Sequence, residues 1–293
     1  MLYTMILLNY SKTIAITANK CYNVLKRGKG GDALDFYDEY RFKHSADAAY
    51  TDGTSTHIHN GYEILYYVRG DAEYVMEGSV YKLRPRDLLF IRPRTFHNLN
   101  PLSPAVYERF VIGFPEGKIP EALKEFADNA KEIYRIPEDS PIDRLFTEWS
   151  ELEDTLSEPE LEILLGSAVE KILLYLKYMP SESAVEPIRV NSTLADMLKY
   201  IDEHPTEEIS AQSLSARFFV SSSWIVHTFK KALGISLMNY VCKKRILYAQ
   251  NLIQNGENPT EAAKLCNYDD YTTFYRQYKK ITGHSPRCDY IYK

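Results

Sequence analysis

Residues 210–234 have the sequence SAQSLSARFFVSSSWIVHTFKKALG, and the same pattern returns at residues 258–283 as NPTEAAKLCNYDDYTTFYRQYKKITG. Each stretch predicts a short helix, a tight turn and a second helix that ends in an aromatic residue, two lysines, two further residues and a glycine. A unit that occurs twice is a stronger signal than either copy alone. The pair predicts two helix-turn-helix units.

The ends of these helices carry residue types that cap helices. Asn258 suits the N-cap, Pro259 suits the first helical position, and Glu261 would complete a capping box. The aspartates at 269–270 and Ser221 suit the caps of the two second helices. These residues support the helix boundaries that the repeat indicates.

Each second helix has an apolar face and a polar face. Ile225 with Phe229, and Phe274 with Tyr278, are four residues apart, so both pairs are expected in a core. The candidate DNA-contacting residues on the polar faces are Ser222, Ser223, His227 and Lys230 in the first unit and Tyr271, Thr272, Tyr275, Arg276 and Lys279 in the second. Such side chains suit the major groove and its phosphates, although a polar face is also typical of a helix in solvent.

One continuous helix is predicted between the two units, at residues 236–256. About 20 residues at 1.5 Å each give a helix of about 30 Å. Successive major grooves on one face of B-DNA are about 34 Å apart, so the helix is long enough to favour DNA binding over two unrelated helix pairs. The basic cluster Lys243, Lys244 and Arg245 lies on this helix, where it could contact the DNA backbone or face solvent.

Residues 194–286 resemble the C-terminal DNA-binding domain of the AraC family of bacterial transcription regulators, through FKKALG, KKRILYAQNLI and YRQYKKITGHSP. The resemblance implies sequence-specific binding of double-stranded DNA. His227 and Thr228 stand where this family commonly has an Arg and an apolar residue, and Asn267 replaces the usual turn glycine. Asn tolerates left-handed backbone, so the turn remains compatible with the family fold.

The N-terminal part of the chain has a different period. Residues 36–115 contain short alternating apolar runs separated by Gly, Pro and Asp, which is typical of an all-β sandwich or barrel. Amphipathic helices are predicted at 141–156 and 158–179, and the second is expected to pack on the barrel, to form half of a dimer contact or to belong to the core alone. Residues 180–192 are rich in Pro, Ser and charge and predict a linker.

The stretch HIHNGYEILYYVRG, at residues 57–70, holds two histidines and a glutamate. His57, His59 and Glu63 fall on one face of an extended strand, and such groups bind transition metals in many proteins. Together with YKLRPRDLLFIRPRTFH, the stretch resembles the cupin-type sensory domain of many AraC-family regulators. The resemblance implies that these three residues and His97 occupy the ligand positions of metal-binding cupins.

Three interpretations of this cluster compete: a catalytic metal centre, a metal in a sensing role, and a metal-free pocket that hydrogen-bonds a small polar effector. A DNA-binding domain on the same chain favours sensing, and Arg86 at a usual glycine position of the cupin motif favours the metal-free pocket. The residues expected to bind the effector are His57, His59, Glu63, Tyr67 and His97. The metal alternative uses the same residues without the tyrosine.

The resemblance implies a sugar or another small metabolite as effector, with no cofactor. Aromatic rings can stack on sugar faces, and the tyrosines available for this are Tyr62, Tyr66, Tyr67 and Tyr74.

The composition fits a folded soluble protein of two domains, with 293 residues, 45% hydrophobic and 26% charged. Residues 191–293 hold 13 Lys and Arg against 10 Asp and Glu, or +3, which leaves −8 for the rest of a chain whose net charge is −5. A basic C-terminal third favours a polyanionic partner. The four cysteines form no CxxC pair and favour a reducing cytoplasm, and no apolar run is long enough for a membrane helix.

The predicted fold is multidomain, with an all-β cupin-like barrel followed by an all-α domain of two helix-turn-helix motifs joined by a linker helix. The expected divisions are a cupin-like effector-binding barrel with an N-terminal arm (1–115), a helical dimerisation or support region (116–179), a linker (180–192) and an AraC-type DNA-binding domain (193–293). The hypothesis is a cytoplasmic, effector-controlled transcription regulator that acts as a homodimer. The alternative is a metal-dependent cupin enzyme or a metal sensor with a helical interaction module.

Overall fold

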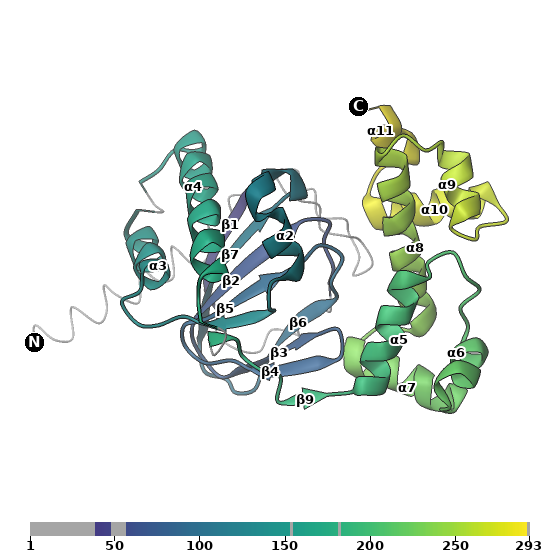
Figure 1. The fold of residues 1–293 in the computed structure, drawn as a ribbon, viewed down its shortest axis with the longest axis horizontal. Helices are drawn as coiled ribbons and strands as arrows, with labels where there is room; N and C mark the ends of the chain where they lie inside the picture. The colour runs from purple at the N-terminus through teal and green to yellow at the C-terminus, as the bar shows by residue number, and fades with distance from the viewer. Residues whose placement is uncertain (1–38, 48–56, 153–154, 181–182, 292–293) are drawn as a thin grey trace, which may run out of the picture.

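The computed structural model describes residues 39–47, 57–152, 155–180 and 183–291 (Figure 1). The N-terminal part of the chain forms a β-rich body, and the C-terminal part forms a helical body beside it. The arm that the sequence predicts at the N-terminus falls mostly within residues 1–38, outside the described residues.

Two antiparallel sheets build the β-rich body. Their strands are β1 (Arg41–Asp47), β2 (Tyr62–Arg69), β3 (Ala72–Met76), β4 (Ser79–Lys82), β5 (Asp87–Ile91), β6 (His97–Pro101), β7 (Tyr107–Phe114), β8 (Ile133–Arg135) and β9 (Arg189–Val190). One sheet has the order β1-β7-β2-β5-β8 and the other the order β6-β3-β4-β9. The predicted all-β fold of this region is confirmed.

Two of these strands lie where the sequence predicted other structure. β8 lies in a segment predicted as helical, and β9 lies in the predicted linker. Both predictions were wrong at these points, because strands of three and two residues are too short to show an alternation of apolar residues.

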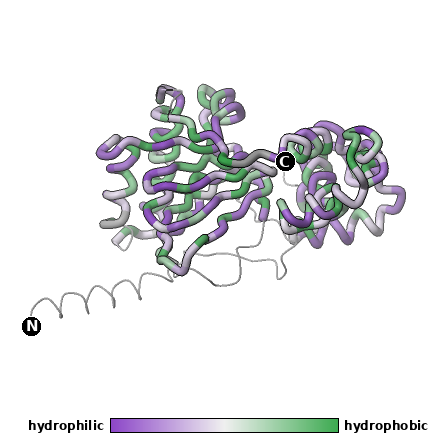
Figure 2. Tube along the Cα trace, turned by 90° about the horizontal axis from the view of Figure 1, so that it is seen from below, coloured by the Kyte–Doolittle hydropathy of each residue, from purple (hydrophilic) through white to green (hydrophobic). Residues whose placement is uncertain are grey.

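Alternation along β2 divides the β-rich body into two cores. Ile64 and Tyr66 belong to a core shared with helices, whereas Leu65 and Tyr67 belong to a core between the sheets. Figure 2 shows hydrophobic residues interspersed with hydrophilic ones along the strands. Glu63 lies two residues before Leu65, so it faces the space between the sheets.

Helices cover the outer face of the five-stranded sheet. They are α2 (Glu121–Asn129), α3 (Pro141–Leu152) and α4 (Glu158–Lys177), and a 3-10 turn, η1 (Glu116–Lys118), precedes them. A capping box formed by Ser157 and Glu160 begins α4, as expected for Ser followed three residues later by Glu. α2 lies within the region 116–179 that was predicted as helical, ahead of the two helices predicted there by residue range.

The helical body contains both predicted repeats. Its helices are α5 (Ser192–Glu203), α6 (Ala211–Phe218), α7 (Ser222–Leu233), α8 (Leu237–Gln254), α9 (Pro259–Leu265), α10 (Tyr271–Thr282) and α11 (Pro286–Ile291). α6 with α7, and α9 with α10, form the two helix-turn-helix units, and α8 joins them. The prediction of two such motifs joined by one helix is confirmed.

The cap residues explain where these helices begin and end. Ser221 accepts a hydrogen bond from the Trp224 amide at the start of α7, and Asp270 caps α10 in the same way. Both second helices end at a left-handed glycine, Gly234 (φ 71°) and Gly283 (φ 80°). Of the capping residues predicted for the second helices, Ser221 and Asp270 are confirmed, whereas Asp269 is not the N-cap of α10.

The predicted capping box of α9 is wrong. Asn258 caps this helix by accepting from the Thr260 amide, but the Glu261 carboxylate pairs with Lys264 at 2.8 Å. Asn267, at φ 61°, takes the left-handed conformation expected of a residue that replaces glycine in the turn.

Candidate functional site

Two chain segments bring the predicted site residues of the β-rich body together. His57 and His97 form a β-bridge with two backbone hydrogen bonds of 3.1 and 3.2 Å, and Glu63 lies near the start of β2. The ring centroids of His57 and His97 are 4.1 Å apart, and those of His59 and His97 are 4.8 Å apart. The structure therefore gathers His57, His59, Glu63 and His97 into one cluster, which we call the histidine cluster.

Backbone carbonyls orient two of the rings. The Nδ1 atom of His59 is 2.7 Å from the Gly61 carbonyl, and Nδ1 of His97 is 2.9 Å from the Thr95 carbonyl. A carbonyl oxygen can only accept, so each Nδ1 must donate, and in a neutral ring Nε2 is then an acceptor. These Nε2 atoms lie 3.6 Å and 3.9 Å from the two oxygens of Glu63.

Burial keeps His97 neutral. Its side chain is buried, and burial, with the neighbouring His57 and His59 rings, holds the pKa of His97 well below its usual range. Its Nε2 atom has no hydrogen-bond partner among the described residues. An imidazole lone pair that faces a carboxylate favours a cation or a donor group of a ligand between them.

The donor set fits either kind of occupant. One ligand atom each from His57, Glu63 and His97 lies within 4.8 Å of the others, and neutral imidazoles with a carboxylate suit zinc and other first-row metals. Hydroxyl groups of a small polar molecule could donate to the same atoms. The Nδ1 bonds to backbone carbonyls orient the rings in either case.

The structure does not bring every predicted effector-binding residue to this cluster. Tyr67 shares the inner face of β2 with Glu63, but four residues separate them, about 13 Å along a strand. Its hydroxyl lies at Gly70, where a Cβ atom would come within 2.5 Å of it.

Two of the tyrosines predicted to stack on a sugar lie on the face of β2 that points away from the histidine cluster. Tyr62 and Tyr66 point toward the helices, where their hydroxyls donate to Asp128 and Asp143. Tyr74 stacks on His97 with centroids 5.9 Å apart, so it is the tyrosine that lines the cluster.

The polar faces of α7 and α10 expose matching stripes. Ser223, His227 and Lys230 are exposed on α7, and the residues at the equivalent positions of α10, 49 residues later, are Thr272, Arg276 and Lys279. Tyr271 and Tyr275 are also exposed on α10, at 40% and 36%.

Two residues of α7 differ from the prediction. Ser222 is half-buried and donates to the Ala211 carbonyl of α6 at 3.2 Å, so it faces the neighbouring helix. Val226 is 52% exposed and stands at the position equivalent to Tyr275, inside the stripe. The sequence analysis missed Val226 because it selected polar residues, although the repeat itself marks the position.

The basic cluster of α8 is not available to DNA in this arrangement. Lys243 and Lys244 are 1% and 8% exposed, and Arg245 donates to the carbonyls of Pro205 and Glu207. The expectation of a DNA or solvent contact was wrong for the two lysines, because α8 passes through the core of the helical body and against the barrel.

Within the described part of the chain, no helix is both long and apolar enough to cross a membrane.

Comparisons with known proteins match both bodies of the chain. Residues 43–166 match the model of an AraC-like ligand binding domain, and residues 214–288 match a helix-turn-helix domain. The arabinose operon regulatory protein of Salmonella typhimurium is 26% identical over 77% of this chain and 82% of its own length. A probable transcriptional regulator, LumQ of Photobacterium leiognathi, is 30% identical over 50% of this chain and 56% of its own length.

Among solved structures, ToxT of Vibrio cholerae is 13% identical and covers 87% of this chain and 97% of its own, with a TM-score of 0.36.

Proposed function

This chain belongs to the AraC family of DNA-binding transcription regulators with a ligand-binding domain, and on that premise we propose that α7 and α10 bind two half-sites while an effector in the histidine cluster controls the binding. The observation that carries the DNA part is the repetition of an exposed stripe at the same helical positions of both units. α8 has 18 residues, about 27 Å of helix, which supports placing the two stripes in neighbouring major grooves.

The two stripes differ in chemistry, and this supports a division of labour between the half-sites. α10 offers Arg276, which can bond a guanine edge with two donors, beside Lys279 for a phosphate. α7 offers Val226 and His227 and a single exposed lysine in its stripe, Lys230, so it is suited to apolar contacts with thymine methyl groups.

Selection of duplexes from a random library tests this proposal with the full chain. The expected product is a two-part motif with half-sites about 10 bp apart. A variant with Arg276→Ala should lose selectivity at one position of one half-site, whereas Arg287→Ala, at an exposed position of α11, should keep the motif. Recovery of sequences with no shared motif would overturn the proposal.

A polar metabolite is the proposed occupant of the histidine cluster, with sugars as the first class to screen. The support is a set of buried acceptors, from His59, His97 and Glu63, of the kind that hydroxyl groups satisfy. A thermal-shift screen of sugars and sugar acids against the wild type and Glu63→Gln should give ligands that stabilise only the wild type.

Metal sensing is the second candidate, because the Nε2 atom of His97, an acceptor in the neutral ring, lies 3.9 Å from a carboxylate oxygen of Glu63. Elemental mass spectrometry of untagged protein decides between the two. About one metal per chain, lost in His97→Asn and kept in His204→Asn, would replace the metabolite with a metal as the occupant. Metal-free protein would leave the metabolite proposal in place.

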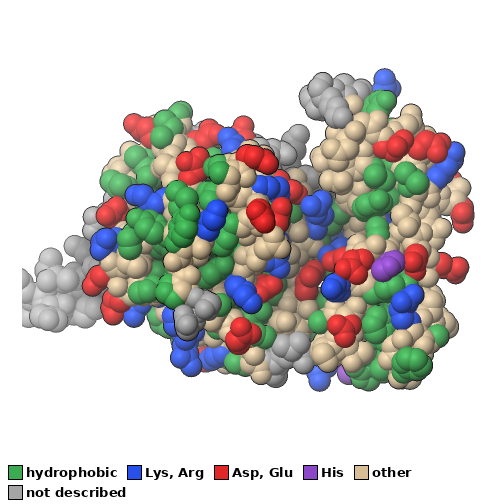
Figure 3. Space-filling model, viewed as in Figure 1, with side chains coloured by type: hydrophobic (Ala, Val, Ile, Leu, Met, Phe, Trp, Pro, Cys, Tyr) green, Lys and Arg blue, Asp and Glu red, His purple; other side chains and the backbone are tan. Residues whose placement is uncertain are grey.

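A homodimer formed through α4 is part of the proposal. Ile163 and Leu174 are 73% and 47% exposed on this helix, its C-cap residue Tyr178 is 77% exposed, and hydrophobic side chains gather over it in Figure 3. Ile163→Glu should shift the sedimentation of the protein toward a monomer, while Val106→Glu, at an exposed position of the barrel, should not. A wild-type monomer at high concentration would refute this part.

A cytoplasmic location completes the proposal, supported by the thiols of Cys242 and Cys266, which are free in the structure. The relatives are described as regulators, and we propose no catalytic role for the histidine cluster.

A further inference from the structure

The segments that carry the cluster histidines also enter the helical body. Ile58 lies between His57 and His59, and Phe96 directly precedes His97. Since neighbouring side chains of an extended segment point to opposite sides, these two apolar residues point away from the cluster. Both have 0% exposure and belong to the same hydrophobic core as helices α5 to α10.

Phe96 makes the closest ring contact at this boundary. Its centroid is 4.5 Å from that of Tyr240 on α8, and the ammonium group of Lys244 lies 5.6 Å from its ring. Thus a residue adjacent to a cluster histidine forms part of the core of the DNA-binding domain.

Lys244 binds the same loop through polar contacts. Its Nζ atom donates to the Arg94 carbonyl at 2.8 Å, to Glu77 at 3.1 Å and to Asp202 at 2.7 Å. Glu77 in turn hydrogen-bonds both the amide and the carbonyl of Phe96, with its Oε1 atom and its amide respectively. The loop from Arg94 to His97 is therefore attached to α8 on one side and to the cluster on the other.

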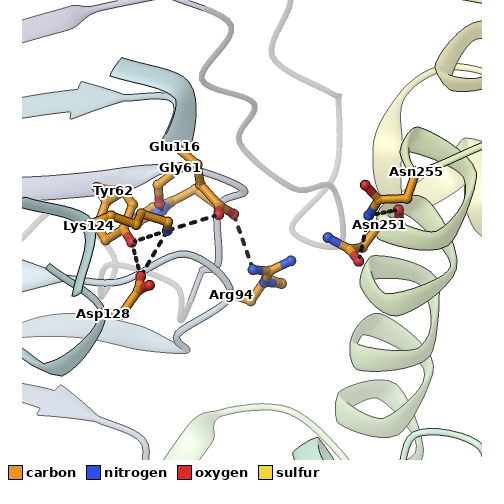
Figure 4. A network of polar contacts seen from close by, with 9 residues as sticks. Gly61, Tyr62, Arg94, Glu116, Lys124, Asp128, Asn251 and Asn255 are labelled. Atoms are coloured by element: carbon orange, nitrogen blue, oxygen red, sulfur yellow. Dashed lines mark hydrogen bonds and ion pairs between the residues drawn. The ribbon is translucent and has the colours of Figure 1, made fainter. Parts of the chain in front are cut away.

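A cleft lies between the two bodies beside these contacts. It has a volume of about 570 Å3, and four of the charges that line its barrel side are paired within the barrel, Arg94 with Glu116 at 3.1 Å and Lys124 with Asp128 at 2.9 Å. Figure 4 shows these pairs facing Asn251 of α8 and Asn255, the C-cap residue of that helix, across the cleft. Acidic and basic side chains also gather along this boundary in Figure 3.

We propose that Ile58 and Phe96 transmit the occupancy of the histidine cluster to the DNA-binding domain, with Lys244 holding the docked arrangement. The proposal deepens the proposed function, since it takes the cluster as the effector site. Rings that turn to bind an occupant move the backbone of residues 57–59 and 95–97, and that backbone also positions Ile58 and Phe96. Protein cores are close-packed, so a small shift of Phe96 changes the fit against Tyr240.

An occupant regulates by this route only if it binds the docked and undocked arrangements with different affinities. Residues 57–59 and 95–97 belong both to the histidine cluster and to the boundary with the helical body, and this is the physical reason for a difference in affinity.

Hydrogen exchange of the full chain, followed by mass spectrometry, tests the proposal without DNA or effector. Glu63→Gln alters the cluster without touching the boundary, and we expect it to change exchange of the 237–254 amides by about tenfold, within the usual range of coupling between sites. In a Phe96→Leu background the same substitution should change exchange less than about twofold.

Two matched controls make the result specific. Asp87→Asn alters another buried carboxylate of the barrel, one that pairs with Arg135, and should leave the 237–254 amides unchanged in either background. Phe114→Leu alters a buried Phe on the helix-covered face and should keep the effect of Glu63→Gln. If Glu63→Gln does not fold, His59→Gln replaces it.

Each outcome has one meaning. An effect of Glu63→Gln that is equal in both backgrounds, or absent from the wild type, would overturn the coupling even if operator selection succeeds. Failure of operator selection would overturn the proposed function and leave the exchange result standing.

Discussion

Replacement of Lys244 by methionine should undock the DNA-binding domain from the barrel. The lysine is 8% exposed and makes two hydrogen bonds across the boundary, to the Glu77 carboxylate and the Arg94 carbonyl, and a third to Asp202 within the helical body. Hydrogen bonds of charged groups contribute about 1.5–3 kcal/mol each. The Glu77 and Asp202 side chains are 30% and 34% exposed, so water recovers part of that energy. Methionine also keeps most of the apolar stem that packs against Phe96.

We therefore expect a net loss of about 2–3 kcal/mol of docking free energy, or a change of about 30- to 150-fold in the ratio of docked to undocked molecules. Hydrogen exchange of the 237–254 amides at pH 7.5 measures that ratio where the docked and undocked arrangements interconvert faster than an exposed amide exchanges. Lys264→Met is the matched control, because Lys264 pairs with Glu261 inside its own unit and is 64% exposed.

Adding Glu77→Gln to Lys244→Met should restore part of the docking, since it removes a carboxylate left without its cation. Unchanged exchange in Lys244→Met, or a change no larger than in Lys264→Met, would show that the ion cluster does not hold the two bodies together.

Four further predictions concern DNA binding and pH. Arg276→Ala should weaken operator binding by about 1–3 kcal/mol and relax one base position in a binding titration, and a uniform loss on all sequences would make Arg276 a phosphate contact. Lys279→Ala should reduce the slope of log affinity against log salt by about 0.9, so an unchanged slope would remove Lys279 from the phosphate contacts. Val226→Ala should cost about 1 kcal/mol of preference for thymine at one position, measured with thymine-to-uracil substitution, and equal binding of both bases would contradict the methyl contact. Burial, with Glu77 and against Lys244, raises the pKa of Asp202 from 3.8 to about 6. The folded protein then holds a proton that the unfolded chain releases, so stability from this group should fall as the pH rises from about 4 to about 6, and Asp202→Asn should flatten Tm over that range. A parallel Tm profile in the variant would show that another group titrates.

The features that the sequence predicted well are local ones. The two helix-turn-helix units depend on caps, turns and four-residue spacing, all of which lie within about 25 residues of each other. Ser221, Asp270 and the two terminal glycines act in the structure as their residue types suggest. The grouping of His57 and His59 on one face was predicted from the alternation of side chains along a strand. Their distant partner His97 was predicted only from the family resemblance.

The errors of the sequence analysis have different origins. Tyr62 and Tyr66 could have been assigned to the outer face, because two residues of a strand share a face only when their residue numbers differ by an even number. Tyr62 and Tyr66 differ from Glu63 by one and by three. The burial of Lys243 and Lys244, in contrast, depends on the barrel docking against α8, and no pattern within residues 236–256 reports that contact. Val226 required comparison of the two repeats position by position.

The short strand β9 bears on the spacing of half-sites that the proposed homodimer can bind. It pairs with β4, and the Ile188 amide donates to the Val80 carbonyl at 2.8 Å, so the segment just before α5 is part of the sheet. A flexible tether would let each DNA-binding domain of a dimer search a range of half-site spacings, with binding that weakens gradually as the span departs from the tether length. A domain joined through a sheet strand instead has a fixed reach, so the proposed homodimer should bind operator pairs at one spacing, and insertion of either half a helical turn or a whole turn of about 34 Å should abolish that binding.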